Sequence, residues 1–329
     1  MKMNNEKNNL TLGIDLGGTK IDIGLVDSSG IILRRELIKT NKNGPEAVVS
    51  EISNVVKKMQ LPNETPLAVG IGMAGQIQAE AGVVHFAPNL GWVDFPLGSE
   101  LQKQLNIPVK VTNDVRAAAW GEWLFGAGIG CSDLICLFIG TGIGAGIVCN
   151  GEMLLGSHNA AGEVGHMTLE LNGPPCSCGN HGCFEALASG WAIAKRTKEV
   201  ITYDSYEGKR FLDLIGGTQD DITARVVLEA YRKNSGIAIR VIDEVKAALV
   251  AGIANLANAF NPAKIILGGG VITSAPFLLD VVREGIAKRA LKTTSESLEI
   301  VQPQLKGDAG VIGAAAFAVN ELKRQQKNG

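Results

Sequence analysis

The stretch Leu10-Thr-Leu-Gly-Ile-Asp-Leu-Gly-Gly-Thr-Lys-Ile-Asp-Ile-Gly-Leu-Val-Asp27 decides the fold of this chain. Apolar residues alternate with small or polar ones on both sides of Gly17-Gly18, which predicts two antiparallel strands joined by a glycine turn. The pattern returns at 133–149, where the turn Gly140-Thr-Gly-Ile-Gly-Ala-Gly146 separates two apolar runs. We interpret this return as an internal duplication of one α/β domain.

The length of 329 residues exceeds that of one ordinary domain, since domains usually hold about 100–200 residues. The strand pattern restarts just after Gly126-Ala-Gly128. We therefore expect a small α/β domain of residues 1–125 plus about 308–329, and a large α/β domain of residues 126–307. The alanine-rich last helix, at about 310–323, is expected to return to the first domain.

The charge balance and the apolar pattern exclude several classes of protein. Lys plus Arg number 31 and Asp plus Glu number 33, so the chain lacks the basic excess of nucleic-acid or anionic-membrane binders. No apolar run reaches the roughly 20 residues that a membrane span needs, and the polar N-terminus lacks a signal segment. We expect a cytoplasmic protein with no nucleic-acid or membrane partner.

The two glycine turns are candidate phosphate cradles. In Gly17-Gly18-Thr19 and Gly140-Thr141-Gly142, missing side chains would let consecutive backbone N–H groups reach phosphate oxygens. Either turn alone is typical of a structural hairpin, because neither matches a P-loop or opens a helix. One copy in each expected domain, with Gly268-Gly269-Gly270 after a later strand, favours a nucleotide site. Asp15, just before the first turn, is predicted to hold Mg²⁺ through water.

A second motif predicts a metal site. His166, Cys176, Cys178 and Cys183 follow the spacing H-x9-C-x-C-x4-C. Three thiolates and one imidazole suit four-coordinate Zn²⁺, and a full set of protein ligands leaves no open position. We therefore expect a structural zinc ion in a loop at 162–185. His181 stays an alternative to His166, although its position between two of the cysteines disfavours it.

A candidate catalytic base follows a buried strand. Val109-Lys-Val111 leads into Asn113-Asp114, and a helix is expected from about residue 115. Asp114 would project from the carboxyl end of the strand, where open α/β sheets hold their ligands. Phosphoryl transfer to a hydroxyl needs such a carboxylate. From the spacing alone, an ordinary helix N-cap is an equally good interpretation.

These motifs resemble those of a known family. Asp15-Leu-Gly-Gly-Thr-Lys20 and Gly140-Thr-Gly-Ile-Gly144 resemble the two phosphate motifs of the actin-like ATPase superfamily, and Leu267-Gly-Gly-Gly270 resembles its adenosine motif. Gly162-Glu-Val-Gly-His166 and Cys176-Ser-Cys-Gly-Asn-His-Gly-Cys-Phe-Glu185 are similar to the signature of the ROK family of bacterial sugar kinases. The resemblance runs from about residue 10 to the end and is strongest to the family's glucokinases.

The resemblance implies a fold and an activity. The fold would be two duplicated actin-like ATPase (ribonuclease H-like) domains with a central cleft for ATP and a hexose. The activity would be ATP-dependent hexose kinase, with glucokinase favoured and N-acetylmannosamine kinase or fructokinase as alternatives. A sugar-sensing regulator of the same family is disfavoured, because the first strand begins about ten residues in and leaves no room for a helix-turn-helix. The family commonly forms dimers or tetramers, so we expect a homo-oligomer.

The same resemblance assigns roles to residues. Asp114 would accept the proton of the sugar 6-hydroxyl as it attacks the γ-phosphate of Mg·ATP. The sugar contacts would be Asn89, Asn113, Asp114, Glu163, His166 and Glu185. The ATP site would comprise Asp15, Gly17, Gly18, Thr19, Lys20, Gly140, Thr141, Gly142, Gly268, Gly269 and Gly270. Without the resemblance, Asn89 is better interpreted as a turn residue, and Glu163 and Glu185 as partners in surface ion pairs.

Overall fold

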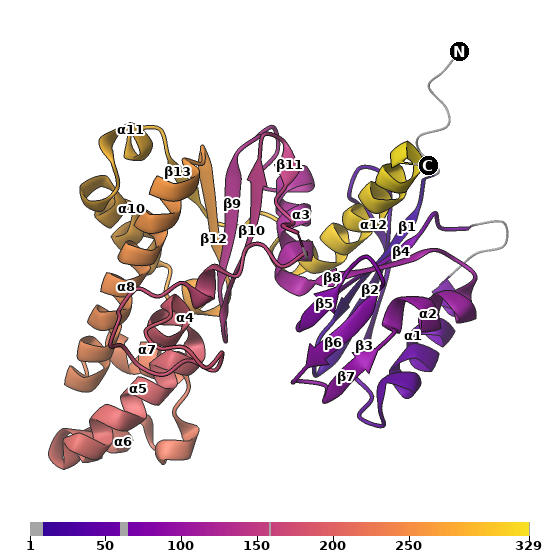
Figure 1. Ribbon diagram of the computed structural model, residues 1–329. Helices are drawn as coiled ribbons and strands as arrows, with labels where there is room; N and C mark the ends of the chain where they lie inside the picture. Colours follow the sequence, from indigo (N-terminus) through magenta and orange to yellow (C-terminus); the bar gives the residue numbers. More distant parts are fainter. Residues whose placement is uncertain (1–8, 60–64, 158, 329) are drawn as a thin grey trace. The chain divides into compact units, whose positions relative to one another are not determined.

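The computed structural model describes residues 9–59, 65–157 and 159–328, which form two compact units (Figure 1). The first unit holds the residues up to Gly130, Met153–Ala161 and the residues from Pro303 onward. The second holds Cys131–Glu152 and Gly162–Gln302. The chain therefore passes between the units four times, after Gly130, Glu152, Ala161 and Gln302.

The first unit is built on a five-stranded sheet in the order β3-β2-β1-β4-β8. Its strands are β1 (Thr11–Leu16), β2 (Lys20–Val26), β3 (Ile32–Lys39), β4 (Val69–Met73) and β8 (Val109–Asn113). The predicted hairpin is present, because β1 and β2 pair antiparallel with Asp15 opposite Asp22. β1, β4 and β8 run parallel, so their carboxyl ends share one edge.

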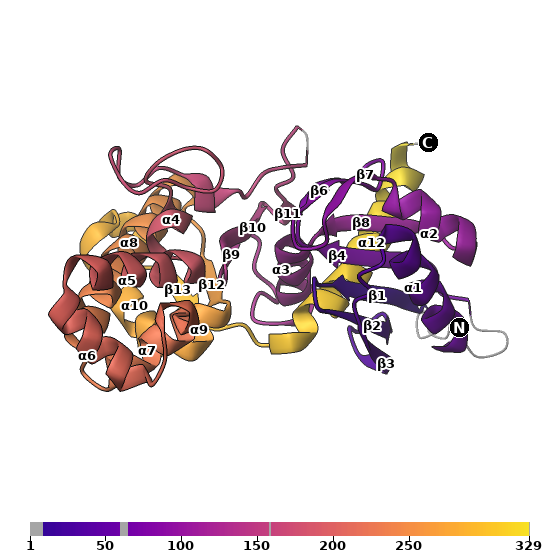
Figure 2. The ribbon, with the colours of Figure 1, turned by 90° about the horizontal axis from the view of Figure 1, so that it is seen from below.

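The alternation in β1 gives the sheet two different faces. Leu12, Ile14 and Leu16 are buried in the core with helix α1 (Pro45–Met59) and helix α2 (Leu97–Leu105). Glycines on the other face allow a helix backbone to approach: a Cβ on Gly13 would lie 1.9 Å from the Val311 carbonyl oxygen. That face is covered by α12 (Ala309–Asn328) and α3 (Asp114–Phe125) (Figure 2).

Helix α12 returns from the end of the chain and packs on α3, β1 and β4. It follows the short 3-10 helix η4 (Lys306–Asp308). A small three-stranded sheet, which the sequence did not predict, also belongs to this unit: β5 (Gln76–Gln78), β6 (Val83–Ala87) and β7 (Trp92–Phe95). These strands are too short and too exposed to give a clear alternating pattern.

The second unit repeats this plan in the order β11-β10-β9-β12-β13. Its strands are β9 (Leu134–Ile139), β10 (Ile143–Cys149), β11 (Glu152–Met153), β12 (Lys264–Gly268) and β13 (Glu299–Val301). As in the first unit, a glycine-turn hairpin, β9–β10, is followed by parallel strands beside its first member. The matching order confirms the predicted duplication of one α/β fold.

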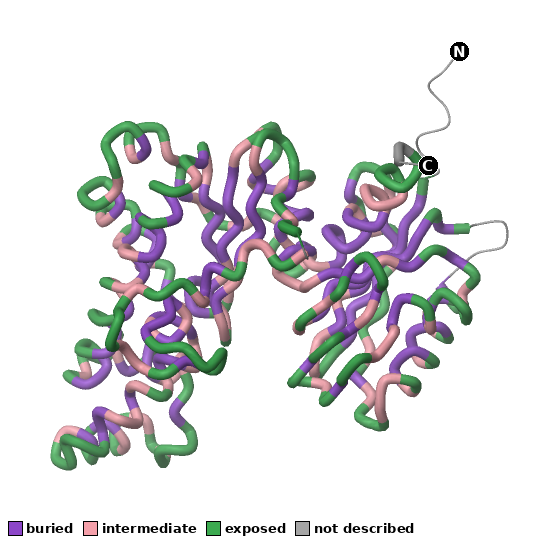
Figure 3. The backbone as a smooth tube through the Cα atoms, in the orientation of Figure 1, coloured by how far each residue is buried: buried purple, intermediate pink, exposed green. Residues whose placement is uncertain are grey.

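Helices cover the second sheet. They are α4 (Phe184–Ala188), α5 (Gly190–Tyr203), α6 (Ser205–Ile215), α7 (Ala224–Arg232), α8 (Gly236–Phe260), α9 (Gly270–Ser274), α10 (Phe277–Arg289) and α11 (Lys292–Ser295), with 3-10 helices η2 (Val164–His166) and η3 (Gln219–Asp221). The long α8 begins at Gly236 and packs against α4, α5, α7 and α10. Buried residues concentrate in the strands and inner helix faces of each unit (Figure 3). Within the described ranges, no helix combines the length and apolar character that crossing a membrane requires.

Candidate functional site

The first glycine turn is held in place by its own hairpin and by the end of β3. The Gly17 N–H donates to the Lys20 carbonyl oxygen at 3.0 Å, which closes the turn. The Thr40 hydroxyl donates to the Gly17 carbonyl at 2.7 Å, and Lys42 Nζ donates to the Gly18 carbonyl. Thr19 and Lys20 are exposed at the tip. The turn is therefore a fixed and accessible loop at the carboxyl end of β1.

The predicted sugar residue Asn89 lies against this turn. It occupies the connection between β6 and β7, far from the glycines in sequence. A Cβ built on Gly18 would lie 3.1 Å from the Asn89 Cβ and 3.3 Å from its carbonyl oxygen. A side chain at Gly18 would therefore push Asn89 away from the turn by a few tenths of an ångström. The structure thus brings together one residue assigned to the sugar and one assigned to ATP.

Asp15 lies at the centre of a group of acidic side chains. Burial, followed by the charges of Asp114 and Asp22, raises its pKa to about 6. Arg35 pairs with Asp22, Nη2 to Oδ2 at 2.6 Å, and Arg35 Nη1 also contacts Asp308 Oδ1 at 2.6 Å. Negative charges that raise the pKa of a neighbouring carboxyl in this way attract a cation, and carboxylate oxygens are the ligands that Mg²⁺ prefers. The surroundings of Asp15 therefore fit a magnesium ion that accompanies a nucleotide.

Asn113, not Asp114, caps helix α3. The Asn113 Oδ1 accepts the backbone N–H groups of Val115 at 2.9 Å and Arg116 at 3.3 Å. Asp114 is the first helical residue, and its Oδ1 accepts the Val115 N–H at 2.9 Å. Burial raises the Asp114 pKa above its ordinary value of 3.8. From its spacing in the sequence, Asp114 is equally well interpreted as a helix cap or as a catalytic base. In the structure Asn113 is the N-cap residue.

The second glycine turn is tied to a predicted sugar residue. The Ile143 N–H donates to Glu185 Oε2 at 2.8 Å, and the Trp191 indole N–H donates to Glu185 Oε1 at 3.2 Å. The backbone N–H groups of Gly190 and Trp191 donate to the carbonyls of Gly140 and Thr141, at 2.8 and 3.2 Å. The start of α5 and the carboxylate of Glu185 therefore hold this turn from two sides.

The third glycine cluster lies beside the second turn. Gly269 has φ +94°, and a Cβ there would lie 2.4 Å from the carbonyl oxygen of Ile139. Ile139 is the last residue of β9, directly before Gly140. Gly269 joins β12 to α9, and glycine alone satisfies both its backbone conformation and this close contact. Two of the segments assigned to ATP are thus adjacent in the second unit.

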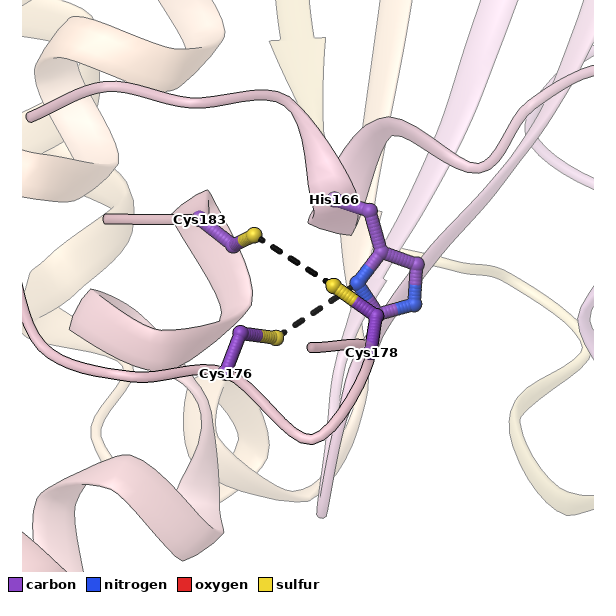
Figure 4. A group of neighbouring side chains, drawn as sticks. All are labelled: His166, Cys176, Cys178 and Cys183. Atoms are coloured by element: carbon purple, nitrogen blue, oxygen red, sulfur yellow. Dashed lines mark hydrogen bonds between the residues drawn. The ribbon is translucent and has the colours of Figure 1, made fainter. Parts of the chain in front are cut away.

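The four predicted metal ligands converge in the second unit (Figure 4). His166 ends η2, Cys183 precedes α4, and the turn between them carries Cys176 and Cys178. Their ligand atoms all lie within 4.8 Å of one another. The Cys176 N–H donates to the Asn180 carbonyl at 2.8 Å, and the Phe184 N–H donates to the Met167 carbonyl at 2.9 Å. Backbone hydrogen bonds therefore bring together ligands from three separate segments.

The separations between ligand atoms fit tetrahedral zinc. Zn–S bonds of about 2.3 Å and Zn–N bonds of about 2.0–2.1 Å at tetrahedral angles place two sulfurs about 3.8 Å apart and a sulfur and a nitrogen about 3.6 Å apart. Cys178 Sγ lies 3.7 Å from Cys183 Sγ, and Cys176 Sγ lies 3.6 Å from His166 Nδ1. The alternative ligand His181 is not a member of this described cluster. The donor set and its spacing fit a structural zinc ion.

The predicted site residues fall into two groups. The first unit holds Asp15, Gly17, Gly18, Thr19, Lys20, Asn89, Asn113 and Asp114, and the second holds Gly140, Thr141, Gly142, Glu163, His166, Cys176, Cys178, Cys183, Glu185, Gly268, Gly269 and Gly270. Glu163 is exposed and directly precedes η2. Two residues were not predicted from the sequence: Lys42, which donates to the Gly18 carbonyl of the first turn, and Trp191, which donates to Glu185 beside the second turn. Neither belongs to a recognisable motif, so no local signal identified them.

Comparisons with known proteins agree with this arrangement. A model of the ROK family matches residues 11–321, and the chain therefore belongs to the ROK family. It is 36% identical over 310 residues to a glucokinase from Streptomyces coelicolor, covering 94% of this chain and 97% of that one. The crystal structure of a ROK family glucokinase from Streptomyces griseus in complex with glucose and AMPPNP matches with a TM-score of 0.77 at 36% identity, over 94% of this chain and 99% of that one. The predicted family and fold are confirmed.

The family also contains regulators. A xylose repressor from Caldicellulosiruptor bescii is 33% identical over 316 residues, which cover 94% of this chain and 78% of the repressor. The repressor thus has a portion that this chain does not match, whereas the Streptomyces coelicolor glucokinase is matched over 97% of its length. The comparisons favour the kinases.

Proposed function

We propose that the chain is an ATP-dependent hexose kinase, with glucose as its favoured substrate and the sugar 6-hydroxyl as acceptor. One observation carries the proposal: the half-buried carboxylate of Asp114 lies at the head of α3, close enough to Asp15 to raise the pKa of that residue. A base and a cation-binding carboxylate at one sheet edge are what phosphoryl transfer to a hydroxyl needs. The similarity to proteins named glucokinase supports the same function.

In this proposal Asp114 accepts the proton of the 6-hydroxyl while that oxygen attacks the γ-phosphorus of ATP, the bond from this phosphorus to the β,γ-bridging oxygen breaks, and ADP leaves. Asp114 would act from the start of α3, which the Asn113 side chain caps through the N–H groups of Val115 and Arg116. Backbone N–H groups of the two glycine turns would face the phosphates and stabilise the charge that develops on them. A bound Mg²⁺ would supply further charge stabilisation, and Asp15 would hold it through water. Closure of the two units would exclude water from the transfer.

The sugar would be recognised by amides, carboxylates and one imidazole, which read hydroxyls as both donors and acceptors. Asn89, Asn113 and Asp114 would contribute from the first unit, and Glu163, His166 and Glu185 from the second. His166 Nδ1 faces the cysteine cluster, which leaves Nε2 for a sugar hydroxyl. Zinc would fix the imidazole tautomer and the course of residues 162–185, and so serve specificity rather than proton transfer.

Several finer assignments belong to the same proposal. N-acetylmannosamine and fructose remain alternative acceptors, since the same polar side chains serve several related kinases. The protein would act in the cytoplasm on sugar entering glycolysis, and would assemble as a dimer or tetramer. A sugar-sensing regulator without catalysis would not need Asp114, Asp15 and both glycine turns together.

The test is turnover by the zinc-loaded protein on a panel of hexoses. ADP release should be fastest with glucose, and ³¹P NMR of the product should show phosphate on carbon 6. N-acetylmannosamine or fructose as the best substrate would keep the kinase class and replace the sugar. No turnover on any sugar, with folded zinc-loaded protein, contradicts the proposed function.

A further inference from the structure

Helix α3, which begins with the half-buried Asp114, carries two buried side chains of opposite charge. Arg116 is 5% exposed and Glu122 is 0% exposed. Charged side chains are rarely buried to this degree, because each loses its hydration and must recover it from hydrogen-bond partners in the protein. Both residues bind backbone groups, and Arg116 Nη1 also donates to the side-chain Oδ1 of Asn159 at 2.5 Å, which points to a role for the segments that they hold.

Glu122 binds two segments that are far apart in sequence. Its Oε2 accepts the backbone N–H groups of Ala127 and Gln304, each at 3.0 Å, and its Oε1 accepts the Leu305 N–H at 2.7 Å. Glu122 and Gln304 are 182 positions apart. Both segments adjoin passages between the units, since Gly130 ends the first stretch of unit one and Pro303 begins its last.

Arg116 holds a third segment of the same kind. Its Nη1 donates to the Asn159 carbonyl at 2.8 Å, and its Nη2 donates to the Ala161 carbonyl at 3.0 Å. Ala161 is the last residue of the first unit before the chain enters the second. The predicted sugar residues Glu163 and His166 follow within five positions. Three of the four passages are therefore bound to one helix.

We propose that α3 is the anchor of a hinge, in which Glu122 and Arg116 fix three of the chain passages to the helix that carries Asp114. The inference rests on the proposed kinase function, because it concerns the movement that closes the site. A bound passage bends only beyond its anchored residue, so in these three passages motion is confined to short stretches around 128–131, 161–162 and 302–303. Glu122 and Arg116 are positioning residues, since they act through the backbone.

The helix is well suited to this task. Asp114 and Glu122 are eight positions apart, about 12 Å along a rigid helix. Gly121 and Gly313 bring α3 and α12 into backbone contact: a Cβ on Gly313 would lie 1.7 Å from the Ala117 carbonyl oxygen. The last passage, once bound by Glu122, leads through η4 into this same α12. Asp114, the proposed base, and the two side chains that bind the passages therefore all lie on α3, which packs closely against α12.

The anchoring is tested directly by hydrogen exchange on the full-length protein. In the wild type, the Gln304 and Leu305 amides should stay protected with and without saturating glucose, while exchange changes near 128–131 and 302–303. Glu122→Gln keeps the shape but turns an NH₂ group toward backbone N–H donors, so exchange of these two amides should rise at least tenfold. Thr197→Val, which removes a buried hydrogen bond within α5, is the matched control and should not change them. If the Gln304 and Leu305 amides are as well protected in Glu122→Gln as in the wild type, the proposal that Glu122 anchors this passage is refuted.

A second measurement separates the hinge from a merely structural role. In the wild type, glucose should tighten the binding of a non-hydrolysable ATP analogue, because both ligands favour the closed form. Glu122→Gln should reduce this coupling factor at least threefold while leaving glucose affinity without nucleotide within twofold. Coupling equal to that of the wild type, in a folded variant, refutes the proposal. If the wild-type protein turns over no sugar, the proposed kinase function is refuted. The exchange of the Gln304 and Leu305 amides then still shows whether Glu122 anchors the last passage.

Discussion

The carboxylate of Glu185 accepts the backbone N–H of Ile143 at 2.8 Å, so a residue assigned to the sugar also holds the second glycine turn. Its other oxygen accepts the Trp191 indole N–H at 3.2 Å. A Cβ on Gly142 would lie 2.4 Å from Glu185 Oε2, which shows how closely turn and carboxylate pack. One side chain thereby links the proposed sugar and phosphate sites within the second unit.

This link predicts a double effect of one substitution. Glu185→Ala should raise the KM of both glucose and ATP by roughly tenfold to a hundredfold, because a hydrogen bond to a charged group contributes about 1.5–3 kcal/mol. Initial rates with each substrate varied in turn measure this. Trp191→Phe, which removes only the indole N–H, is the milder comparison. A change confined to glucose would show that the turn does not depend on Glu185.

Asp114→Asn should lower kcat by about 100-fold to 10,000-fold, the range typical of a lost general base. Glucose affinity, measured by calorimetry, should stay within a few-fold, since the amide keeps the shape. Burial raises the Asp114 pKa, so its charged form is disfavoured in the fold and the variant should show a higher Tm at pH 7.5. That gain should shrink as the pH falls and the wild-type carboxyl becomes protonated. Substantial turnover in Asp114→Asn would remove it as the base.

The raised pKa of Asp114 also predicts a pH profile. A base must be ionised to accept a proton, so kcat/KM should rise with pH and level off above the pKa of Asp114. Since burial raises this pKa, the midpoint should lie above the ordinary value of 3.8. Rates measured from pH 4.5 to 8.5 with saturating magnesium give the profile. A fitted midpoint at or below 3.8 would be inconsistent with a carboxylate base whose pKa burial raises.

The cysteine cluster should hold about one zinc ion per chain, as elemental analysis of the purified protein would show. Removing it with a chelator should loosen residues 162–185 and raise the KM of glucose at least tenfold, with a smaller effect on ATP, because His166 belongs to both the cluster and the sugar site. Cys183→Ser, which removes one ligand, should have the same effect as the chelator. Cys131→Ser, outside the cluster, is its matched control. Full activity of metal-free protein would contradict this role.

Gly13→Ala should destabilise the fold by about 1–3 kcal/mol or more, the usual cost of overpacking. The new Cβ would lie 1.9 Å from the Val311 carbonyl oxygen, so α12 would have to move away from β1. Gly307→Ala is the control, because a Cβ there meets nothing within 4 Å. Denaturant unfolding of both variants gives the difference. Equal stability of the two would mean that α12 does not need close contact with β1.

Local features of the chain were readable from its residues. The period-two alternation around Gly17-Gly18 predicted the β1–β2 hairpin, and its return predicted the duplicated sheet. The spacing of His166 and the three cysteines predicted the cluster, because the loop that joins them is short. These features depend on neighbours within about twenty residues, so the order of the residues largely determines them.

Tertiary structure alone decided the contacts between distant segments. Nothing local distinguishes Glu122 from a surface helix residue, yet packing of α3 against α12 places its carboxylate beside the N–H groups of Gln304 and Leu305, 182 and 183 positions away. Glu185 accepts the N–H of Ile143, 42 positions away, because the fold likewise brings α4 beside the second glycine turn. Such contacts arise only after the sheets and helices have packed, because burial then forces each polar group to find whichever partner the fold brings near.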